Sequence, residues 1–350
     1  MRLGLNVGYW GMRGALADDL ALVREAEKLG FAVVWAAEAY GSDAVSVLSF
    51  LAAKTQTIDV GSAILQIPAR TPTMTAMTAA TLDTLSGGRF RLGLGVSGPQ
   101  VSEGWHGVRF AKPLARTREY LDIVNLALSR ERVRYAGNTY TLPLPDGPGK
   151  ALHLMLQPVR EHIPIYLAAI GPKNLELCGE IADGWLPVFF APGHAGEPLA
   201  RIEAGRAKAG RDTSTFDVAP TVPMVVGDDL DACAAPVRPY AALYLGGMGS
   251  REQNFYNALA IRMGFGEAAQ QIQRLYLNRE YDTACAAVPF EFVDGTSLLG
   301  PLDRIAERME HFAAAGVTTL TVSPYGTDAD QRISALRVAA EALDKSGLGS

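Results

Sequence analysis

Cysteine is scarce in this chain of 350 residues, which contains only Cys178, Cys233 and Cys285. The three lie far apart and no C-x-x-C spacing occurs, so the sequence predicts neither a disulfide framework nor a zinc site. Histidine is nearly as rare. The five histidines show no spacing typical of metal ligands, so we expect no bound metal.

Long apolar runs and clusters of positive charge are also missing. No apolar run is long enough to span a bilayer, and the N-terminus lacks the apolar core of a signal peptide. The formal net charge is −5, and lysine and arginine do not gather in one stretch, which argues against a nucleic-acid surface. The sequence thus predicts a cytoplasmic protein that binds neither membranes nor nucleic acid.

The signatures of several enzyme classes are absent or out of place. No G-x-S-x-G motif and no pair of catalytic carboxylates is evident. The stretch GLGVSG at residues 93–98 fits the pattern G-x-G-x-x-G, but it lies far from the start of the chain. Residues 99–107 after it are typical of a loop rather than of the helix that a dinucleotide fingerprint needs. A Rossmann fold is therefore disfavoured.

What the sequence does contain is a repeated alternation of strand and helix. Two stretches show it openly, EAEKLGFAVVWAAE and HFAAAGVTTLTVSP, each a helix end, a glycine stop and an apolar strand. Strands that are apolar throughout suit a parallel sheet covered on both faces. We predict eight strands, each followed by a helix, at residues 2–8, 31–38, 59–66, 90–97, 163–170, 184–190, 216–226 and 317–325.

Eight such units favour an α/β fold of the (β/α)8 TIM-barrel type over the alternative, an open doubly wound sheet. The alternation breaks twice. Residues 130–160 are rich in turn-forming residues and predict a hairpin, and residues 248–300 predict a mostly helical insertion. The whole chain is thus expected to form one barrel domain with two insertions.

In a (β/α)8 barrel the active site lies at the carboxyl ends of the strands. Here those ends are apolar and aromatic, and we expect Tyr9, Trp10, Phe189 and Phe190 to line a substrate pocket. As an alternative, Tyr9 and Trp10 only plug the end of the first strand. Such a rim suits a planar organic cofactor that carries the chemistry itself.

Few side chains at the rim can exchange a proton. Glu38 ends a very apolar strand, where a carboxylate is costly unless it is paired, so we interpret it as catalytic. His106 follows the fourth strand and is the second catalytic candidate, with an ordinary surface histidine as the alternative. Gly171, Pro172 and Lys173 open a helix whose free N–H groups predict an anion site, unless they form a plain helix start.

Five longer stretches carry a family resemblance and together span nearly the whole chain: MRLGLNVGYWG, KLGFAVVWAAEAYGSDA, VGSAILQIPARTPTMTAMTAATLDTLSGGRFRLGLGVSG, IPIYLAAIGPKNLELCGEIADGW and GPLDRIAERMEHFAAAGVTTLTVSP. In them the chain resembles the bacterial luciferase-like superfamily, and within it the branch of oxidoreductases that use the deazaflavin coenzyme F420. The resemblance implies a TIM barrel with insertions.

The resemblance also implies cofactor contacts. It places a non-prolyl cis peptide bond between Ala63 and Ile64, behind the deazaflavin ring. The glycines at residues 93–98 would then let the backbone approach the ring and its side chain. Further contacts would come from Val96, Ser97 and Gly98 beside the cofactor, from Ala168, Ala169, Ile170, Gly171 and Pro172 at its phosphate, and from Lys173, Arg109 or Lys112 at its anionic tail.

One departure from the family concerns the second strand. The sugar-phosphate dehydrogenase of this branch has an acid followed by histidine after that strand, whereas this chain has Glu38 followed by Ala39. A sugar-phosphate substrate is therefore not expected. If the reaction needs an acid–base group, Glu38 or His106 has to supply it.

Three functions remain open. The first is an oxidoreductase that transfers hydride between the deazaflavin C5 and a small organic substrate. The second is an FMN-dependent luciferase-like monooxygenase, and the third is a protein that binds the cofactor without turnover. The resemblance also implies a homodimer, and the helix expected at residues 73–85 has a face of Thr, Ala and Met residues suited to close packing.

Overall fold

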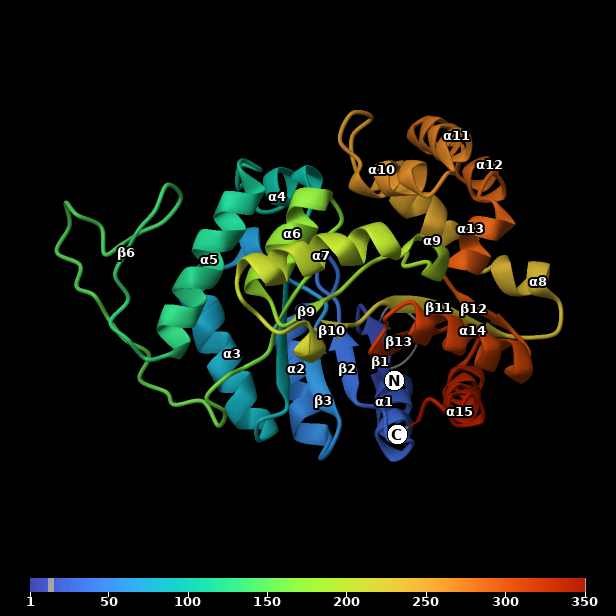
Figure 1. Cartoon of the computed structure of the whole chain (residues 1–350), viewed down its shortest axis with the longest axis horizontal. Helices are drawn as coiled ribbons and strands as arrows, with labels where there is room; N and C mark the ends of the chain where they lie inside the picture. The colour runs from blue at the N-terminus through green and yellow to red at the C-terminus, as the bar shows by residue number, and fades with distance from the viewer. Residues whose placement is uncertain (12–15, 350) are drawn as a thin grey trace.

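The strands predicted from the sequence form one curled parallel sheet with helices packed outside it (Figure 1). The computed structural model describes residues 1–11 and 16–349. In this part of the chain the sheet has eleven strands, in the order β10-β9-β8-β5-β3-β2-β1-β13-β11-β12, with β4 beside β5. Their bounds are β1 (Arg2–Gly8), β2 (Val33–Ala36), β3 (Asp59–Ser62), β4 (Leu65–Gln66), β5 (Phe90–Gly95), β8 (Ile165–Leu167), β9 (Gly184–Trp185), β10 (Asp217–Val218), β11 (Thr221–Val226), β12 (Leu298–Gly300) and β13 (Thr319–Pro324).

The sheet closes into a barrel through one segment. Strand β10 pairs with β9 and β11 pairs with β13, yet only Ala219 and Pro220 separate β10 from β11. The Ala219 N–H donates to the carbonyl oxygen of Trp185, and the Thr321 N–H donates to that of Pro220, both at 2.9 Å. Strands β3 and β4 are two parts of one barrel strand, and so are β10 and β11. Strand β12 pairs at the edge of β11 and is not counted among the eight. The remaining count gives the predicted (β/α)8 barrel.

Helices after the strands cover the barrel from outside. They are α1 (Leu16–Lys28), α2 (Ala44–Lys54), α3 (Pro72–Ser86), α5 (Pro113–Leu128), α6 (Pro172–Ile181), α7 (Gly196–Lys208), α14 (Leu302–Ala314) and α15 (Ala329–Lys345). Shorter helical turns are η1 (Ile67–Ala69), α4 (Pro99–Gly104), η2 (Pro192–His194) and η3 (Thr213–Thr215). None of the helices in the described residues is both long and apolar enough to cross a membrane.

Two insertions extend from the barrel, as predicted. The first contains the antiparallel hairpin β6 (Tyr135–Ala136) and β7 (Thr141–Leu142), and Figure 1 shows it as an arm that reaches away from the body beside α5. The second gathers at the opposite end of the view and comprises α10 (Phe255–Arg262), α11 (Gly266–Leu277), α12 (Tyr281–Ala286) and α13 (Phe290–Gly295). Between β11 and the second insertion lie two short helices, α8 (Leu230–Ala234) and α9 (Arg238–Ala242), and the π-helix η4 (Leu243–Gly247).

Polar side chains meet inside the barrel near the amino ends of its strands. The carboxylate of Asp217 accepts hydrogen bonds from the hydroxyls of Tyr166 and Thr319, both at 2.8 Å. It also forms ion pairs with Arg91 at 3.2 Å and Arg2 at 3.0 Å. Burial, reinforced by the charge of Asp217, raises the pKa of Tyr166, so its phenol remains a donor. One carboxylate thus links β1, β5, β8, β10 and β13.

We predict that Asp217→Ala lowers the free energy of unfolding by about 3–5 kcal/mol, the usual cost of removing one partner from a buried ion pair. The substitution leaves Arg91 and Tyr166 facing the vacated position inside the barrel. The matched control is Asp146→Ala, an exposed aspartate in a loop, for which we expect a change within about 0.5 kcal/mol. Urea unfolding followed by circular dichroism measures both, and equal stability of the two variants would contradict the account.

Candidate active site

The third barrel strand bulges near its carboxyl end. Residues 61–65 on β3 and β4 lie opposite residues 91–94 on β5, so one extra residue is accommodated on the third strand. The peptide bond between Ala63 and Ile64 lies in this bulge and is cis. This confirms the backbone geometry that the family resemblance implied.

Two glycines of β5 make room for the bulge. A Cβ atom on Gly93 would lie 1.9 Å from the carbonyl oxygen of Ser62, and one on Gly95 would lie 2.9 Å from Cδ1 of Ile64. The Ser62 hydroxyl also bonds to the N–H and the carbonyl oxygen of Gly93, at 2.9 Å each. The expectation that these glycines admit a bound ring needs correction at Gly93, which instead admits the neighbouring strand.

The cofactor segments predicted from the resemblance meet around Gly95. Its absent Cβ would lie 3.4 Å from the Cβ of Ala168 and close to Ile64, so segments from three strands are in contact at this point. Val96, Ser97 and Gly98 continue the chain from here. The loop expected after them was wrong, because Gly98 is the N-cap of α4 and Pro99 occupies its first turn, where proline is favoured.

The segment expected at the phosphate leads into the amino end of α6. Gly171 is the N-cap residue, makes no side-chain capping bond, and has open space where a Cβ would be. The first N–H groups of a helix have no partner within it, which favours an anion there. Arg262, at the end of α10, donates to the carbonyl oxygen of Ile170 (3.1 Å), and Lys173 is exposed. Two cations therefore lie beside a helix end, while Ala169 is buried in the wall.

Glu38 lies just beyond β2, and its carboxylate is already paired. Arg70 donates to both carboxylate oxygens, at 2.6 and 2.8 Å, and also reaches Asp43 at 3.1 Å. The side chains of Arg70 and Glu38 are only 16% and 10% exposed. The bonds to Glu38 raise the pKa of Arg70, so its guanidinium remains charged. The ion pair favours a structural task for Glu38, and its catalytic role stays a prediction.

Gln66, at the end of β4, connects Glu38 to His106. Its Nε2 donates to the Glu38 carbonyl oxygen (3.0 Å), and its Oε1 lies 2.7 Å from Nε2 of His106. Because a carbonyl oxygen only accepts, the amide nitrogen must face Glu38 and the amide oxygen must face the imidazole. Nε2 of His106 is therefore the donor, which leaves Nδ1 of a neutral ring as the acceptor. Gln66 is 1% exposed, so water competes little for these bonds.

Tyrosines from η4 and from the second insertion form a roof near the end of β1. Tyr9 lies against Gly41, where a Cβ would come within 2.7 Å of its ring. Tyr244 and Tyr256 pack edge to face with ring centroids 4.8 Å apart. Burial, and to a smaller extent Tyr9, raise the pKa of Tyr256 to about 12. The phenols in this roof therefore stay protonated and can donate hydrogen bonds.

Trp10 and Phe190 point away from the mouth, contrary to expectation. Trp10 packs edge to face on Phe50 of α2, and Phe190 stacks on Phe312 of α14, with centroid distances of 6.1 and 5.9 Å. Both rings thus pack on helices outside the sheet, which is why they are not available at the mouth.

Phe189 belongs to the core of the second insertion. It is 5% exposed and lies between Phe292 and the rings of Tyr240 and Tyr244. Its φ angle is 50°, in the left-handed region that side chains rarely adopt. It thus supports the roof from within, and contact with a substrate stays a prediction.

Sequence reasoning missed several residues that the structure brings to the mouth: Gln66, Arg70, Tyr244, Tyr256 and Arg262. The first two had a visible signal, since polar residues in QIPAR end an apolar strand. The other three come from η4 and from the insertion after it, whose position over the barrel no local pattern indicates. Within the residues that the structure describes, no group of three His, Cys, Asp or Glu side chains could hold a metal ion.

The family model described as luciferase-like monooxygenase matches residues 5–319. A Mycobacterium tuberculosis protein, named as a coenzyme F420-dependent oxidoreductase, is 44% identical over 343 residues, covering 96% of this chain and 99% of that protein. The 5,10-methylenetetrahydromethanopterin reductase of Archaeoglobus fulgidus is 31% identical, covering 89% of this chain and 91% of the reductase.

Solved structures share the fold. The coenzyme F420-dependent tetrahydromethanopterin reductase of Methanopyrus kandleri superposes with a TM-score of 0.82 at 25% identity, covering 97% of both chains. The match to the family model extends over most of the chain, and the relatives match nearly end to end. The chain belongs to the luciferase-like monooxygenase family.

Proposed function

We propose that the chain is a coenzyme F420-dependent oxidoreductase that transfers hydride between the deazaflavin and a small organic substrate. Two relatives above 30% identity support this, because one is named for coenzyme F420 and the other is a methylenetetrahydromethanopterin reductase. The observation that carries the proposal is the meeting of Ile64, Gly95 and Ala168 at the barrel mouth beside the amino end of α6.

The residues at the mouth fit an anionic, planar cofactor. The uncapped end of α6 at Gly171 suits a phosphate, and Arg262 and Lys173 suit the negative charges of an oligoglutamate tail. The bulge at Ala63–Ile64 would form one wall, and residues 96–98 another. Segments from strands three, four and five thus offer both an apolar surface and an anion site.

When bound, the deazaflavin supplies a carbon at position five that donates or accepts hydride. The protein then has to bind the substrate, exclude water and handle the accompanying proton. His106 is suited to the proton because Gln66 fixes its ring with Nε2–H as the donor and Nδ1 as the acceptor. A neutral ring can take a proton at Nδ1, and a protonated ring can give one up.

Glu38 acts in this proposal through the residues it holds. Its carboxylate binds Arg70 with two short hydrogen bonds, and its carbonyl oxygen orients the Gln66 amide. The chain of contacts from Arg70 through Glu38 and Gln66 ends at the imidazole of His106. The departure from the family after the second strand is thereby compensated by a histidine from the fourth.

The substrate is proposed to be apolar. Tyr40 and Trp105 are 58% and 66% exposed, their ring centroids lie 6.5 Å apart, and Trp105 directly precedes His106 in the chain. Exposed aromatic rings at a site entrance favour an apolar or cyclic molecule. Enones, imines and alcohols are the classes that fit a hydride transfer with one proton.

We predict direct transfer of hydrogen from carbon to carbon. Reduced coenzyme F420 with deuterium at C5 is incubated with the enzyme and a panel of substrates that includes 2-cyclohexenone. The product should carry deuterium on carbon, as mass spectrometry would show, because hydride does not exchange with water. A product without deuterium at the carbon that accepts the hydride, the β-carbon of 2-cyclohexenone, or an oxygenated product that forms only in air, would refute the hydride mechanism.

Gln66 variants test how His106 is held. Gln66→Leu removes the acceptor and should slow turnover by about 10²-fold, the low end of general acid–base effects, without weakening cofactor binding. Gln66→Glu keeps an acceptor for the imidazole but loses the amide that donates to the Glu38 carbonyl oxygen, so it should slow turnover less than Gln66→Leu does. The control is Gln271→Leu, an exposed glutamine on α11.

The tautomer of His106 gives a readout that needs no turnover. In the protein without cofactor, long-range ¹H–¹⁵N spectra of the imidazoles should show Nε2 protonated and Nδ1 free in His106. The Gln66→Leu variant should lose this preference. A proton on Nδ1 in the natural protein, or no change in the variant, would mean that Gln66 does not position the ring.

We also propose a homodimer in which the arm of one copy covers the other. Large apolar side chains are exposed on the arm, where Leu144, Leu152 and Met155 are 64%, 73% and 87% exposed. Met74 and Met77 on α3 are each 51% exposed, and Figure 1 shows the arm leaving the body beside α5 and near α3. Apolar exposure of this extent marks an interaction surface.

Sedimentation equilibrium at micromolar concentration should give twice the chain mass. Replacing Leu152 and Met155 by serine should shift the mass toward one chain, whereas serine at Tyr281, an exposed aromatic on α12, should not. A single-chain mass for the natural protein would contradict the dimer.

A further inference from the structure

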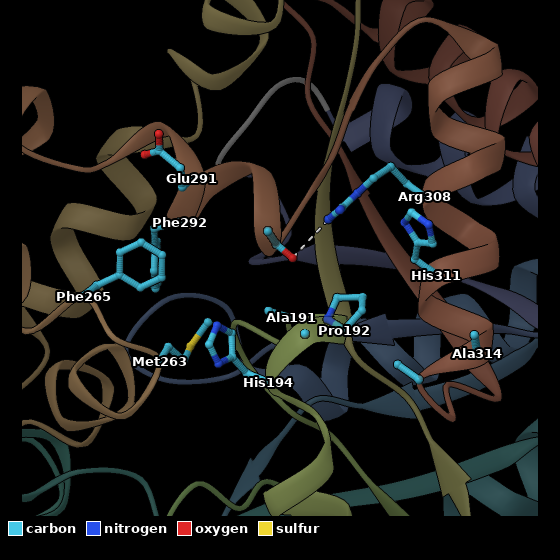
Figure 2. Close-up of a pocket in the computed structure, with 13 residues that line it drawn as sticks. Ala191, Pro192, His194, Met263, Phe265, Glu291, Phe292, Arg308, His311 and Ala314 are labelled. Carbon is cyan, nitrogen blue, oxygen red and sulfur yellow. Dashed lines mark hydrogen bonds between the residues drawn. The ribbon is translucent and has the colours of Figure 1, made fainter.

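A cavity of about 530 Å³ lies outside the barrel wall. Its lining comes from η2, from the turn between α10 and α11, and from α13 and α14, as Figure 2 shows. The stacked rings of Phe190 and Phe312 belong to the layer between the barrel and its outer helices on the same side. Small-molecule sites typically enclose about 300–1,000 Å³, so the cavity has the size of a ligand site and is separate from the mouth.

The cavity has two unlike walls. On one side lies the partly exposed ring of Phe265, backed by Met263 and Phe292, which are 6% and 1% exposed; the two rings meet edge to face at 5.3 Å. On the other side α14 presents Arg308 and His311, three residues apart and so on one face of the helix. This pairing suits a molecule with a flat apolar body and a negative end.

Arg308 lacks a carboxylate partner of its own among the described residues. Its Nη2 donates to the carbonyl oxygens of Asp294 (2.8 Å) and Gly295 (3.2 Å), and its Nε is buried without an acceptor. The Asp294 carboxylate instead accepts hydrogen bonds from Arg304, at 2.8 and 2.9 Å. Burial lowers the pKa of Arg308, which indicates a positive charge only partly compensated by its surroundings.

The other titratable groups at the cavity do not neutralise the positive charge of Arg308. His194 and His311 are exposed on its rim and would add positive charge when protonated. Glu291 is exposed as well, and Figure 2 shows its carboxylate directed away from Arg308. Glu307 is exposed on α14 and does not line the cavity. An anion inside the cavity would therefore find a half-buried guanidinium.

We propose that this cavity is a second binding site, for an amphipathic small molecule with a planar apolar body and a carboxylate. The apolar body lies against Phe265, with Met263 and Phe292 buried behind it, and the carboxylate lies toward Arg308. The site goes beyond the proposed hydride transfer, since neither the cofactor segments nor His106 contribute to it.

The position of the cavity connects it to the roof of the mouth. Phe292 packs against Phe189 at 5.2 Å, and Phe189 packs against Tyr244 at 5.7 Å. A ligand that contacts Phe265, whose ring packs on Phe292, therefore adjoins the same aromatic core that supports the roof tyrosines. Occupation of the cavity is expected to change the KM of the enzyme rather than to compete with the cofactor.

The test uses 2-naphthoate as the probe in isothermal titration calorimetry, with the protein saturated by coenzyme F420. We expect one site per chain. Arg308→Gln should weaken binding at least about tenfold, since it removes a charge-assisted hydrogen bond. The neutral probe 2-naphthamide should bind the natural protein about as weakly as 2-naphthoate binds the Arg308→Gln variant. Arg337→Gln, which removes an exposed charge on α15, is the matched control and should have no effect.

A second variant tests the site independently, in case the Arg308→Gln variant does not fold. Ala314 is exposed on α14 and lines the cavity, so Ala314→Trp should fill the space and abolish binding while leaving the melting temperature nearly unchanged. Absence of saturable binding to the natural protein would overturn the proposal. So would equal affinity in Arg308→Gln and Arg337→Gln, or binding in Ala314→Trp that matches the natural protein.

Discussion

The closed barrel depends on a single buried carboxylate more than on any other polar group. Asp217 accepts hydrogen bonds or ion pairs from β1, β5, β8 and β13, so strands distant in the sequence are fixed at one point near their amino ends. Because Asp217 sits on the same short segment that pairs with β9 on one side and β13 on the other, it strengthens the joint where the sheet closes. The register fixed there determines which residues meet at the opposite, carboxyl ends.

At those ends the chain uses close backbone packing to shape the mouth. The bulge of the third strand fits only because Gly93 and Gly95 leave room beside it. The bulge is followed by Gln66, which is then in reach of both Glu38 and His106. Local backbone geometry thus positions the amide oxygen that accepts a hydrogen bond from the imidazole of His106, which comes from a different βα unit. The insertion completes the mouth from above with its tyrosines and with Arg262.

The sequence predicted the fold well because each unit carries its own signals. Gly30 and Gly316, expected as helix stops, adopt positive φ angles of 78° and 91°, and the apolar strands after them are buried as expected. Side-chain direction was harder. The expectation for Trp10 and Phe190 failed because each ring packs on an outer helix, α2 or α14. The pairing of Glu38 with Arg70 is likewise a contact across units that no local pattern reveals. Residues of the insertion, such as Tyr256, could be placed over the mouth only once the fold was known.

The central claim is that the mouth is built for an anionic deazaflavin, and a comparative binding titration tests it most directly. Intrinsic and cofactor fluorescence are followed as the purified chain is titrated with coenzyme F420 and, separately, with FMN. The account predicts tighter binding of coenzyme F420, and a loss of that advantage as salt is raised, because Arg262 and Lys173 meet the charged tail and salt screens them. Equal or tighter binding of FMN would contradict the account and would favour a flavin-dependent monooxygenase instead.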